Sequence, residues 1–257
     1  MPFRSALRPV GAHQHVPQCA FPARAGRDGV RRVDVSCPFG GTRVICSLNE
    51  IEALARKAAR GGGMSWGLAE ETGKAVRWLS ANGFPGPQLL AELLCQNDGK
   101  PYCDLAPQQS EGIWHARSGP LCPIVAGTLI CDRAEDLETE AALRLGEVAV
   151  PLLLLPFASE AARTVGSTVT MEWRGVCFGL DGGAPKVRGD EAALGVARVS
   201  SVALSLAGAQ ALGQVWTGAG RHVTCDTMEV LESFAQRTYA PATEESRAGA
   251  GAGRDND

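Results

Sequence analysis

The sequence has few aromatic residues, no excess of one charge and no long apolar run. Phe, Trp and Tyr make up 5% of its 257 residues, and 25 Lys and Arg stand against 28 Asp and Glu. The formal charge of −3 gives no electrostatic case for nucleic-acid binding, which draws most of its affinity from cations against phosphate. No window of about 18 apolar residues is present, so we expect no membrane span. The 45% of hydrophobic residues still suffices for a folded core.

The first 43 residues lack lysine and any helical or strand periodicity. They hold seven Arg, two Asp and five Pro, and these prolines would interrupt the amphipathic helix of a transit peptide. An apolar signal-peptide core is missing, and no apolar run follows Arg31-Arg32 as a twin-arginine signal requires. We expect residues 1–43 to form a disordered extension, and translation from near Val44 is the alternative.

The nine cysteines are scattered and form no Cys-x-x-Cys pair. This usage is typical of a reducing cytoplasm. His222 and Cys225 are the best-spaced ligand pair, but residues three apart on a strand point to opposite faces and no third ligand is near. Gly218-Ala219-Gly220 lacks the third glycine of a dinucleotide fingerprint. We therefore predict no metal site and assign no cofactor.

Capping and periodicity predict three short helices after the head. Residues 47–50 (Ser-Leu-Asn-Glu) form a capping box, and apolar residues then recur at three- and four-residue steps until the glycines at 61–63. A second helix is predicted over 66–81, and a third over 88–94 after a Pro-Gly-Pro turn. Residues 96–120 are rich in turn signals and indicate a loop-rich crossing.

The sequence beyond residue 120 is typical of strands. We interpret the apolar runs 124–131 and 148–155 as buried strands, and 168–173 and 176–178 as a hairpin turning at Arg174-Gly175. Another strand is expected over 196–206. A capping pattern at Asp226 then opens a helix that ends before Pro241.

These elements predict an α+β fold. We expect a helical layer of about three short helices, a mostly antiparallel or mixed β-sheet, and a C-terminal helix. The expected segments are an extension over 1–43, helices over 44–95, a crossing over 96–120, a strand-rich part with the last helix over 121–246, and a Gly/Ala-rich tail over 247–257.

One short motif matches the spacing of a nucleophile elbow. Residues 63–67 read Gly-Met-Ser-Trp-Gly, but they follow a helix, whereas the elbow needs a strand before the serine. We interpret Ser65 as the cap of the second helix. The Gly-Ala alternation at 249–253 favours a flexible tail, with a ligand-covering arm that uses Arg247 or Arg254 as the alternative.

Several stretches of the chain resemble a known family. Residues 47–60 and 64–71, together with the ending Thr238-Tyr239-Ala240-Pro241 to Ser246-Arg247 and the Gly-Ala run, look like an uncharacterised bacterial family known only as a domain of unknown function. The resemblance covers about residues 45–257. It implies bacterial origin and domain limits, and it assigns no catalytic residue.

Two classes of function remain. The first is a cytoplasmic small-molecule enzyme or metabolite-binding protein with a site between helices and sheet. The second is a non-catalytic accessory or assembly protein that binds a protein partner or a second copy of itself. We place the first ahead, with His222, Asp226, His115 and Arg247 as catalytic candidates. Further polar groups for that site are Asp104, Arg117 and Glu172.

Overall fold

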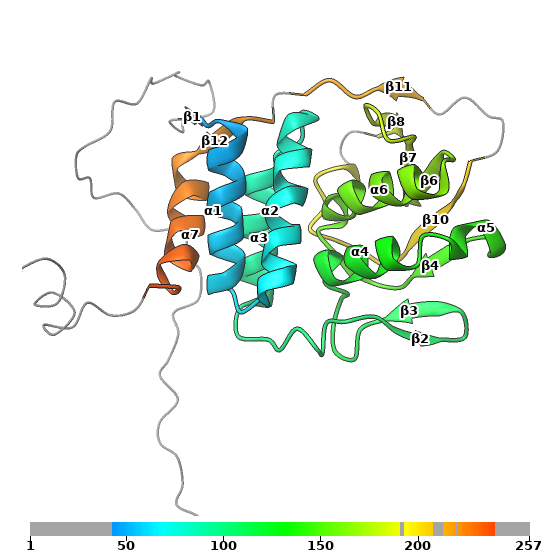
Figure 1. Cartoon of the computed structure of the whole chain (residues 1–257), viewed down its shortest axis with the longest axis horizontal. Coiled ribbons are helices and arrows are strands. Elements are labelled where there is room, and N and C mark those ends of the chain that lie inside the picture. Colours follow the sequence, from blue (N-terminus) through cyan, green and yellow to red (C-terminus); the bar gives the residue numbers. More distant parts are fainter. Residues whose placement is uncertain (1–42, 191–192, 208–212, 219, 240–257) are drawn as a thin grey trace, which may run out of the picture. The chain divides into compact units, whose positions relative to one another are not determined.

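The computed structural model describes the chain from residue 43 to residue 239 with three short gaps (Figure 1). The described residues are 43–190, 193–207, 213–218 and 220–239. Except for Arg43, the predicted N-terminal extension lies outside the described residues, and so do Arg247, Arg254 and the Gly/Ala-rich tail.

The first three helices form where capping and periodicity predict them. In α1 (Leu48–Gly61), the Ser47 hydroxyl accepts from the Glu50 amide at 3.3 Å and the Glu50 carboxylate accepts from the Ser47 amide at 2.8 Å. This is the expected capping box. Helix α2 (Trp66–Ala81) has the predicted bounds, and α3 (Gly86–Asn97) extends the predicted helix at both ends.

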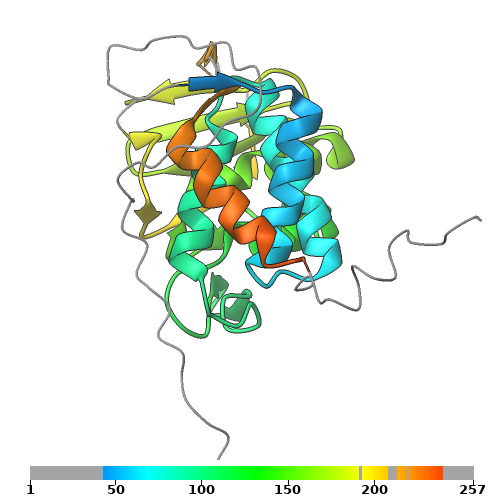
Figure 2. The same ribbon diagram turned by 90° about the vertical axis from the view of Figure 1, so that its left-hand side faces the viewer.

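Helices α1, α2 and α3 pack with α7 (Cys225–Gln236), and we call these four the helical group. Helix α1 contacts both α2 and α7, and α3 contacts the same two helices (Figures 1 and 2). A Cβ atom at Gly61 would lie 1.7 Å from the carbonyl oxygen of Phe234. Only glycine permits that approach, so the carboxyl ends of α1 and α7 lie side by side.

A mixed sheet of eight strands forms the second part of the fold. Its strand order is β11-β8-β7-β6-β10-β4-β3-β2, and every neighbouring pair is antiparallel except β3 with β4. This architecture, with helices first, a sheet in the middle and a last helix, confirms the predicted α+β class. The strands are β2 (Gln108–Ser110), β3 (Ile113–His115), β4 (Leu143–Leu145), β6 (Val169–Trp173), β7 (Val176–Leu180), β8 (Lys186–Gly189), β10 (Val202–Leu206) and β11 (Gln214–Val215).

Two shorter antiparallel pairs complete the strands. The first joins β1 (Arg43–Ile45) to β12 (His222–Thr224), and the second joins β5 (Val148–Ala149) to β9 (Arg198–Val199). Because β1 leads into α1 and β12 leads into α7, the pairing of β1 with β12 places the amino-terminal ends of α1 and α7 close together (Figure 2).

Two predicted strands are wrong because both are mainly helical. Residues 124–131 lie in α4 (Pro123–Asp132), and residues 148–155 contain only β5 before η1 (Pro151–Leu154) and α6 (Leu155–Val165). An unbroken apolar run fits a buried helix as well as a buried strand. The prolines favour the helix, since each of these helices has a proline in its first turn. Backbone N–H groups in a first turn have no partner within the helix, so the N–H that proline lacks costs nothing there.

Other boundaries shift by a few residues. The predicted strand over 196–206 is divided into β9 and β10, and the crossing over 96–120 contains the β2–β3 hairpin. Helix α7 is capped by Thr224, whose hydroxyl accepts from the Thr227 amide at 3.3 Å, so the predicted cap at Asp226 is wrong. The β6–β7 hairpin is confirmed and turns at Gly175, where φ is +88°. The short helix α5 (Asp136–Thr139) was not predicted.

Phe84 connects the helical group with the sheet. It lies in the turn between α2 and α3, is 1% exposed, and meets Phe178 of β7 edge-on at 6.2 Å between ring centroids. The Phe84 ring also stacks on Trp216, with 5.1 Å between the ring centroids. Helix α6 packs on β6 and β7, and α2 contacts both α4 and α6 (Figure 1). The core therefore runs without a break from the helical group into the sheet.

Candidate functional site

Two of the sequence-predicted polar residues contact each other. The Arg117 guanidinium lies 3.4 Å from a carboxylate oxygen of Asp104, across the β2–β3 hairpin that separates them in sequence. Arg117 is exposed. A surface ion pair of this kind contributes about 0–1 kcal/mol to stability.

The remaining candidates lie in separate places. His222 is in β12, where its carbonyl oxygen accepts from the Gln88 side-chain amide at 2.9 Å, and Asp226 is exposed in the first turn of α7. His115 ends β3 and Glu172 lies in β6, both exposed. Among the described residues, no hydrogen bond or ion pair joins His115, Glu172, His222 or Asp226 to one another. The catalytic assignment of these residues stays a prediction.

Four buried or half-buried thiols are held in their neutral form. Burial raises the pKa of Cys122 to about 11, and burial together with the nearby carboxylates of Glu160, Glu71 and Asp132 raises the pKa of Cys131 to about 12. Burial likewise raises the pKa values of Cys46 and Cys177. Because the thiolate is the nucleophile and the metal ligand, none of these four thiols is activated for either chemistry at neutral pH.

The described part of the chain brings no three His, Cys, Asp or Glu side chains together in a way that could hold a metal ion. Nor does any helix described there have the length and apolar character needed to cross a bilayer.

Ser65 has the capping role that its sequence context indicates. Its hydroxyl accepts from the Leu68 amide at 3.4 Å and so begins α2, and Gly63 before it adopts a φ of +91°. Met64 is fully buried, and its sulfur lies 3.2 Å from the Thr72 hydroxyl. The Gly-Met-Ser-Trp-Gly motif thus anchors a turn and caps a helix.

The same motif places Trp66 on the surface. This side chain is 71% exposed, and its neighbours Ser65 and Gly67 are exposed and too small to cover it. The Arg60 guanidinium lies 4.4 Å above the indole ring and donates to the carbonyl oxygen of Met64. Arg60 therefore holds the indole by a cation–π contact while its own position is fixed by the turn.

A second aromatic residue lies beside this pair. Tyr239, 63% exposed, follows α7, and its hydroxyl lies 3.5 Å from the Lys57 ammonium. Lys57 and Arg60 are three residues apart on α1, so they are neighbours on one helix face. They connect Tyr239 to Trp66 across the adjacent ends of α1, α2 and α7. We call these four residues, Lys57, Arg60, Trp66 and Tyr239, the Trp66 surface.

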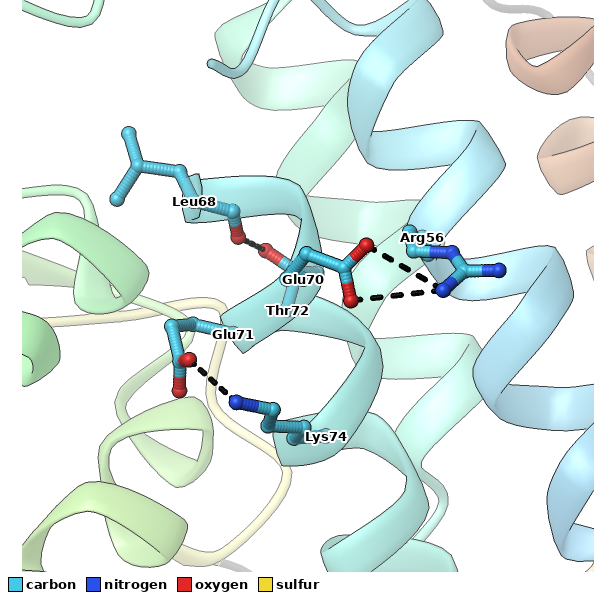
Figure 3. Close-up of polar contacts among 6 residues, drawn as sticks. All are labelled: Arg56, Leu68, Glu70, Glu71, Thr72 and Lys74. Atoms are coloured by element: carbon cyan, nitrogen blue, oxygen red, sulfur yellow. Dashed lines mark hydrogen bonds and ion pairs between the residues drawn. The ribbon is translucent and has the colours of Figure 1, made fainter. Parts of the chain in front are cut away.

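The carboxylates near the Trp66 surface are engaged elsewhere. Glu70 of α2 binds Arg56 of α1, with the Arg56 nitrogen 3.3 and 3.4 Å from its two oxygens, and Glu71 binds Lys74 at 2.7 Å (Figure 3). Figure 3 also shows Thr72 turned back toward the Leu68 carbonyl oxygen, which it binds at 2.7 Å. Among the described residues, neither Lys57 nor Arg60 has a carboxylate within ion-pair distance.

Sequence reasoning missed the Trp66 surface. The sequence held one usable signal, which is that Trp66 directly follows the helix cap Ser65 and precedes Gly67. Neither of these small neighbours can cover the indole. The contribution of Tyr239 left no signal, since it depends on a contact between residues 182 positions apart.

Comparison with known proteins gives one match. No curated protein matches this chain, and no solved structure does. Residues 46–122, which include Lys57, Arg60 and Trp66, match the model of a family described as a protein of unknown function, DUF3726, and so confirm the expected resemblance to such a family over this part of the chain.

Proposed function

We propose that this protein acts by binding another protein, and that the Trp66 surface is where the partner binds. The observation that carries the proposal is the exposed indole of Trp66, held in place by Arg60. Trp, Tyr and Arg are the residue types that most often dominate the energy of protein–protein interfaces. Three of the four residues in this surface are of these types.

Burial of Trp66 by a partner would release a large free energy. Covering a side chain of this size contributes about 2 kcal/mol or more at an interface. Arg60 already restrains the indole and is itself restrained by the Met64 carbonyl, so little side-chain entropy remains to be lost on binding. Four large hydrophobic side chains are exposed among the described residues, and two of them, Trp66 and Tyr239, belong to this one surface.

The thiols support a cytoplasmic location, which we include in the proposal together with the bacterial origin that the family resemblance implies. Disulfide bonds are typical of oxidising compartments. The cysteines at six described positions are free thiols: Cys46, Cys103, Cys122, Cys131, Cys177 and Cys225.

Site-directed photo-cross-linking tests the proposal. The full chain, with the photoreactive residue p-benzoylphenylalanine in place of Trp66, is illuminated in its native cells. A control variant of the same chain carries the photoreactive residue in place of Val215, whose side chain is 53% exposed on edge strand β11. We expect one discrete adduct from position 66 that is missing from position 215, and we expect the cross-linked protein, once purified, to bind the unmodified chain.

Two results would contradict the proposal. Equal adduct patterns from positions 66 and 215 would show that the Trp66 surface is not selective. An adduct of twice the chain's own mass would mean that the surface joins two copies of this protein.

A further inference from the structure

We infer that the partner segment bound by the Trp66 surface is acidic, with Asp or Glu side chains next to an apolar one. The inference rests on the proposed function and names the chemistry of its partner. It follows from the charges at this end of the helical group and from their spacing.

The other cations of the helical group have carboxylate partners. Arg56 pairs with Glu70 at 3.3 Å and Arg77 with Glu52 at 3.2 Å. Arg237 at the end of α7 forms two hydrogen bonds to Asp98, at 2.7 and 3.0 Å. Within the described residues, Lys57 and Arg60 instead have an aromatic neighbour and no carboxylate. Within that part of the chain, neither of these two positive charges is neutralised by a carboxylate.

These two charges lie between the two aromatic residues of the surface. The order across the surface is Tyr239, Lys57, Arg60, Trp66, in which the Lys57 ammonium donates to the Tyr239 hydroxyl and the Arg60 guanidinium lies over the Trp66 ring. A carboxylate near Lys57 and Arg60 would neutralise both, and the apolar side chain next to it in the partner could pack on the indole. Hydrogen bonds between charged partners are about twice as strong as neutral ones, so this pairing adds affinity and selectivity.

An acidic peptide suits this surface better than a nucleic acid. Exposed aromatic rings and cations can also stack and bind single strands. That mode needs a groove with many cations along the backbone, whereas the Trp66 surface supplies two and the chain carries a net charge of −3.

The test follows the indole of Trp66 while defined probes are added. The full chain is prepared with ¹⁵N-labelled tryptophan, and the Trp66 signal among the five indoles is assigned with Trp66→Phe. The probes are a synthetic peptide of repeating Glu-Glu-Leu, a peptide of repeating Lys-Lys-Leu, and oligothymidylate. We expect the Glu-Glu-Leu peptide alone to move the Trp66 signal in a saturable way and to leave the other four in place.

Charge reversal supplies the matched controls. Lys57→Glu and Arg60→Glu should each weaken binding of the Glu-Glu-Leu peptide about tenfold or more. Arg174→Glu makes the same change in net charge at an exposed position in the β6–β7 turn and should leave the affinity unchanged. Unchanged signals from the four other indoles show that each variant is folded.

Three outcomes would overturn the inference: no shift of Trp66 with the Glu-Glu-Leu peptide, an equal or larger shift with Lys-Lys-Leu or oligothymidylate, or an equal loss of affinity in Arg174→Glu. The proposed function would survive any of these if position 66 still gave its selective cross-link, because the partner would then be recognised by other chemistry.

Discussion

Individual thiols differ sharply in reactivity because of where the fold places them. Cys103 is exposed, whereas Cys122 is 1% exposed and Cys131 has three carboxylates nearby that oppose its ionisation. A thiol with a pKa of about 11 or 12 is almost entirely protonated at pH 8, and the protonated form does not attack alkylating reagents.

We therefore predict that iodoacetamide at pH 8 modifies Cys103 at least tenfold faster than Cys122 or Cys131 in the folded protein. Peptide mass spectrometry of timed samples measures the three rates. The same reaction in urea should abolish the difference, which is the control for intrinsic reactivity. Comparable rates for Cys122 and Cys103 in the folded protein would contradict the assignment of Cys122 as a protonated, unreactive thiol.

Helix packing at the Trp66 surface depends on Gly61. An alanine there would place its Cβ 1.7 Å from the Phe234 carbonyl oxygen, so α1 and α7 would have to separate. We predict that Gly61→Ala costs about 1–3 kcal/mol and lowers the melting temperature by several degrees. Differential scanning calorimetry measures the change.

Gly67→Ala is the matched control. It lies in the first turn of α2, and a Cβ atom there meets nothing within 4 Å. Alanine favours helix by about 1 kcal/mol over glycine, so this variant should keep or raise the melting temperature. If both variants lose stability equally, the contact between α1 and α7 is not as close as the structure has it.

The ion pair between Asp98 and Arg237 fastens the end of α7 to the end of α3. Hydrogen bonding to Arg237 lowers the pKa of Asp98 below its ordinary value of 3.8. A carboxyl with a lowered pKa in the folded state stabilises the fold above its ordinary pKa, and this contribution is lost as the pH falls through the lowered value.

Comparison with Asp98→Asn should reveal this contribution. We expect wild type to have the higher urea midpoint by a constant margin between pH 7 and pH 5. The difference between the two urea midpoints should shrink as the pH falls below about 4. Protonation of Asp98 then removes the ion pair from wild type, whereas the Asp98→Asn variant cannot form it at any pH. A margin that stays constant down to pH 3 would mean that the ion pair contributes nothing measurable.

The accuracy of the element predictions varied with the kind of signal. Helices α1 and α2 were predictable because their caps and periodic stripes are local features, and the β6–β7 hairpin was predictable from its alternation and its glycine. The runs at 124–131 and 148–155 were misassigned because unbroken apolar residues carry no period, so the prolines in the first turns of these helices were the only local sign of a helix start.

At the scale of the molecule, Phe84 links the helical group to the sheet. Phe84→Ala should cost about 3–5 kcal/mol, since it removes a buried ring that contacts both Phe178 and Trp216. Urea unfolding measures the loss, and the emission of Trp216, assigned with Trp216→Phe, should shift as its stacking partner disappears. Val215→Ala, beside Trp216 but exposed, should change stability by less than about 0.5 kcal/mol. An unchanged Trp216 emission in Phe84→Ala would contradict this link.

The candidate site shows the limit of sequence reasoning at this scale. The described polar residues that had been chosen by type were dispersed over the β2–β3 hairpin, the sheet and the start of α7, and among them only Asp104 and Arg117 are in contact. The Trp66 surface instead arises from the joint packing of three helices, which brings Lys57 of α1 next to Tyr239. No local pattern in the sequence predicts this contact between Lys57 and Tyr239.

The affinity of the cross-linked partner for variants of this surface tests the central claim most directly. With the partner purified, isothermal titration compares wild type, Trp66→Ala and Val215→Ala. Loss of a dominant interface tryptophan costs about 2 kcal/mol or more, so we expect Trp66→Ala to weaken binding about 30-fold and Val215→Ala to leave the affinity unchanged. Equal affinities for all three proteins would contradict the assignment of the Trp66 surface as the binding site.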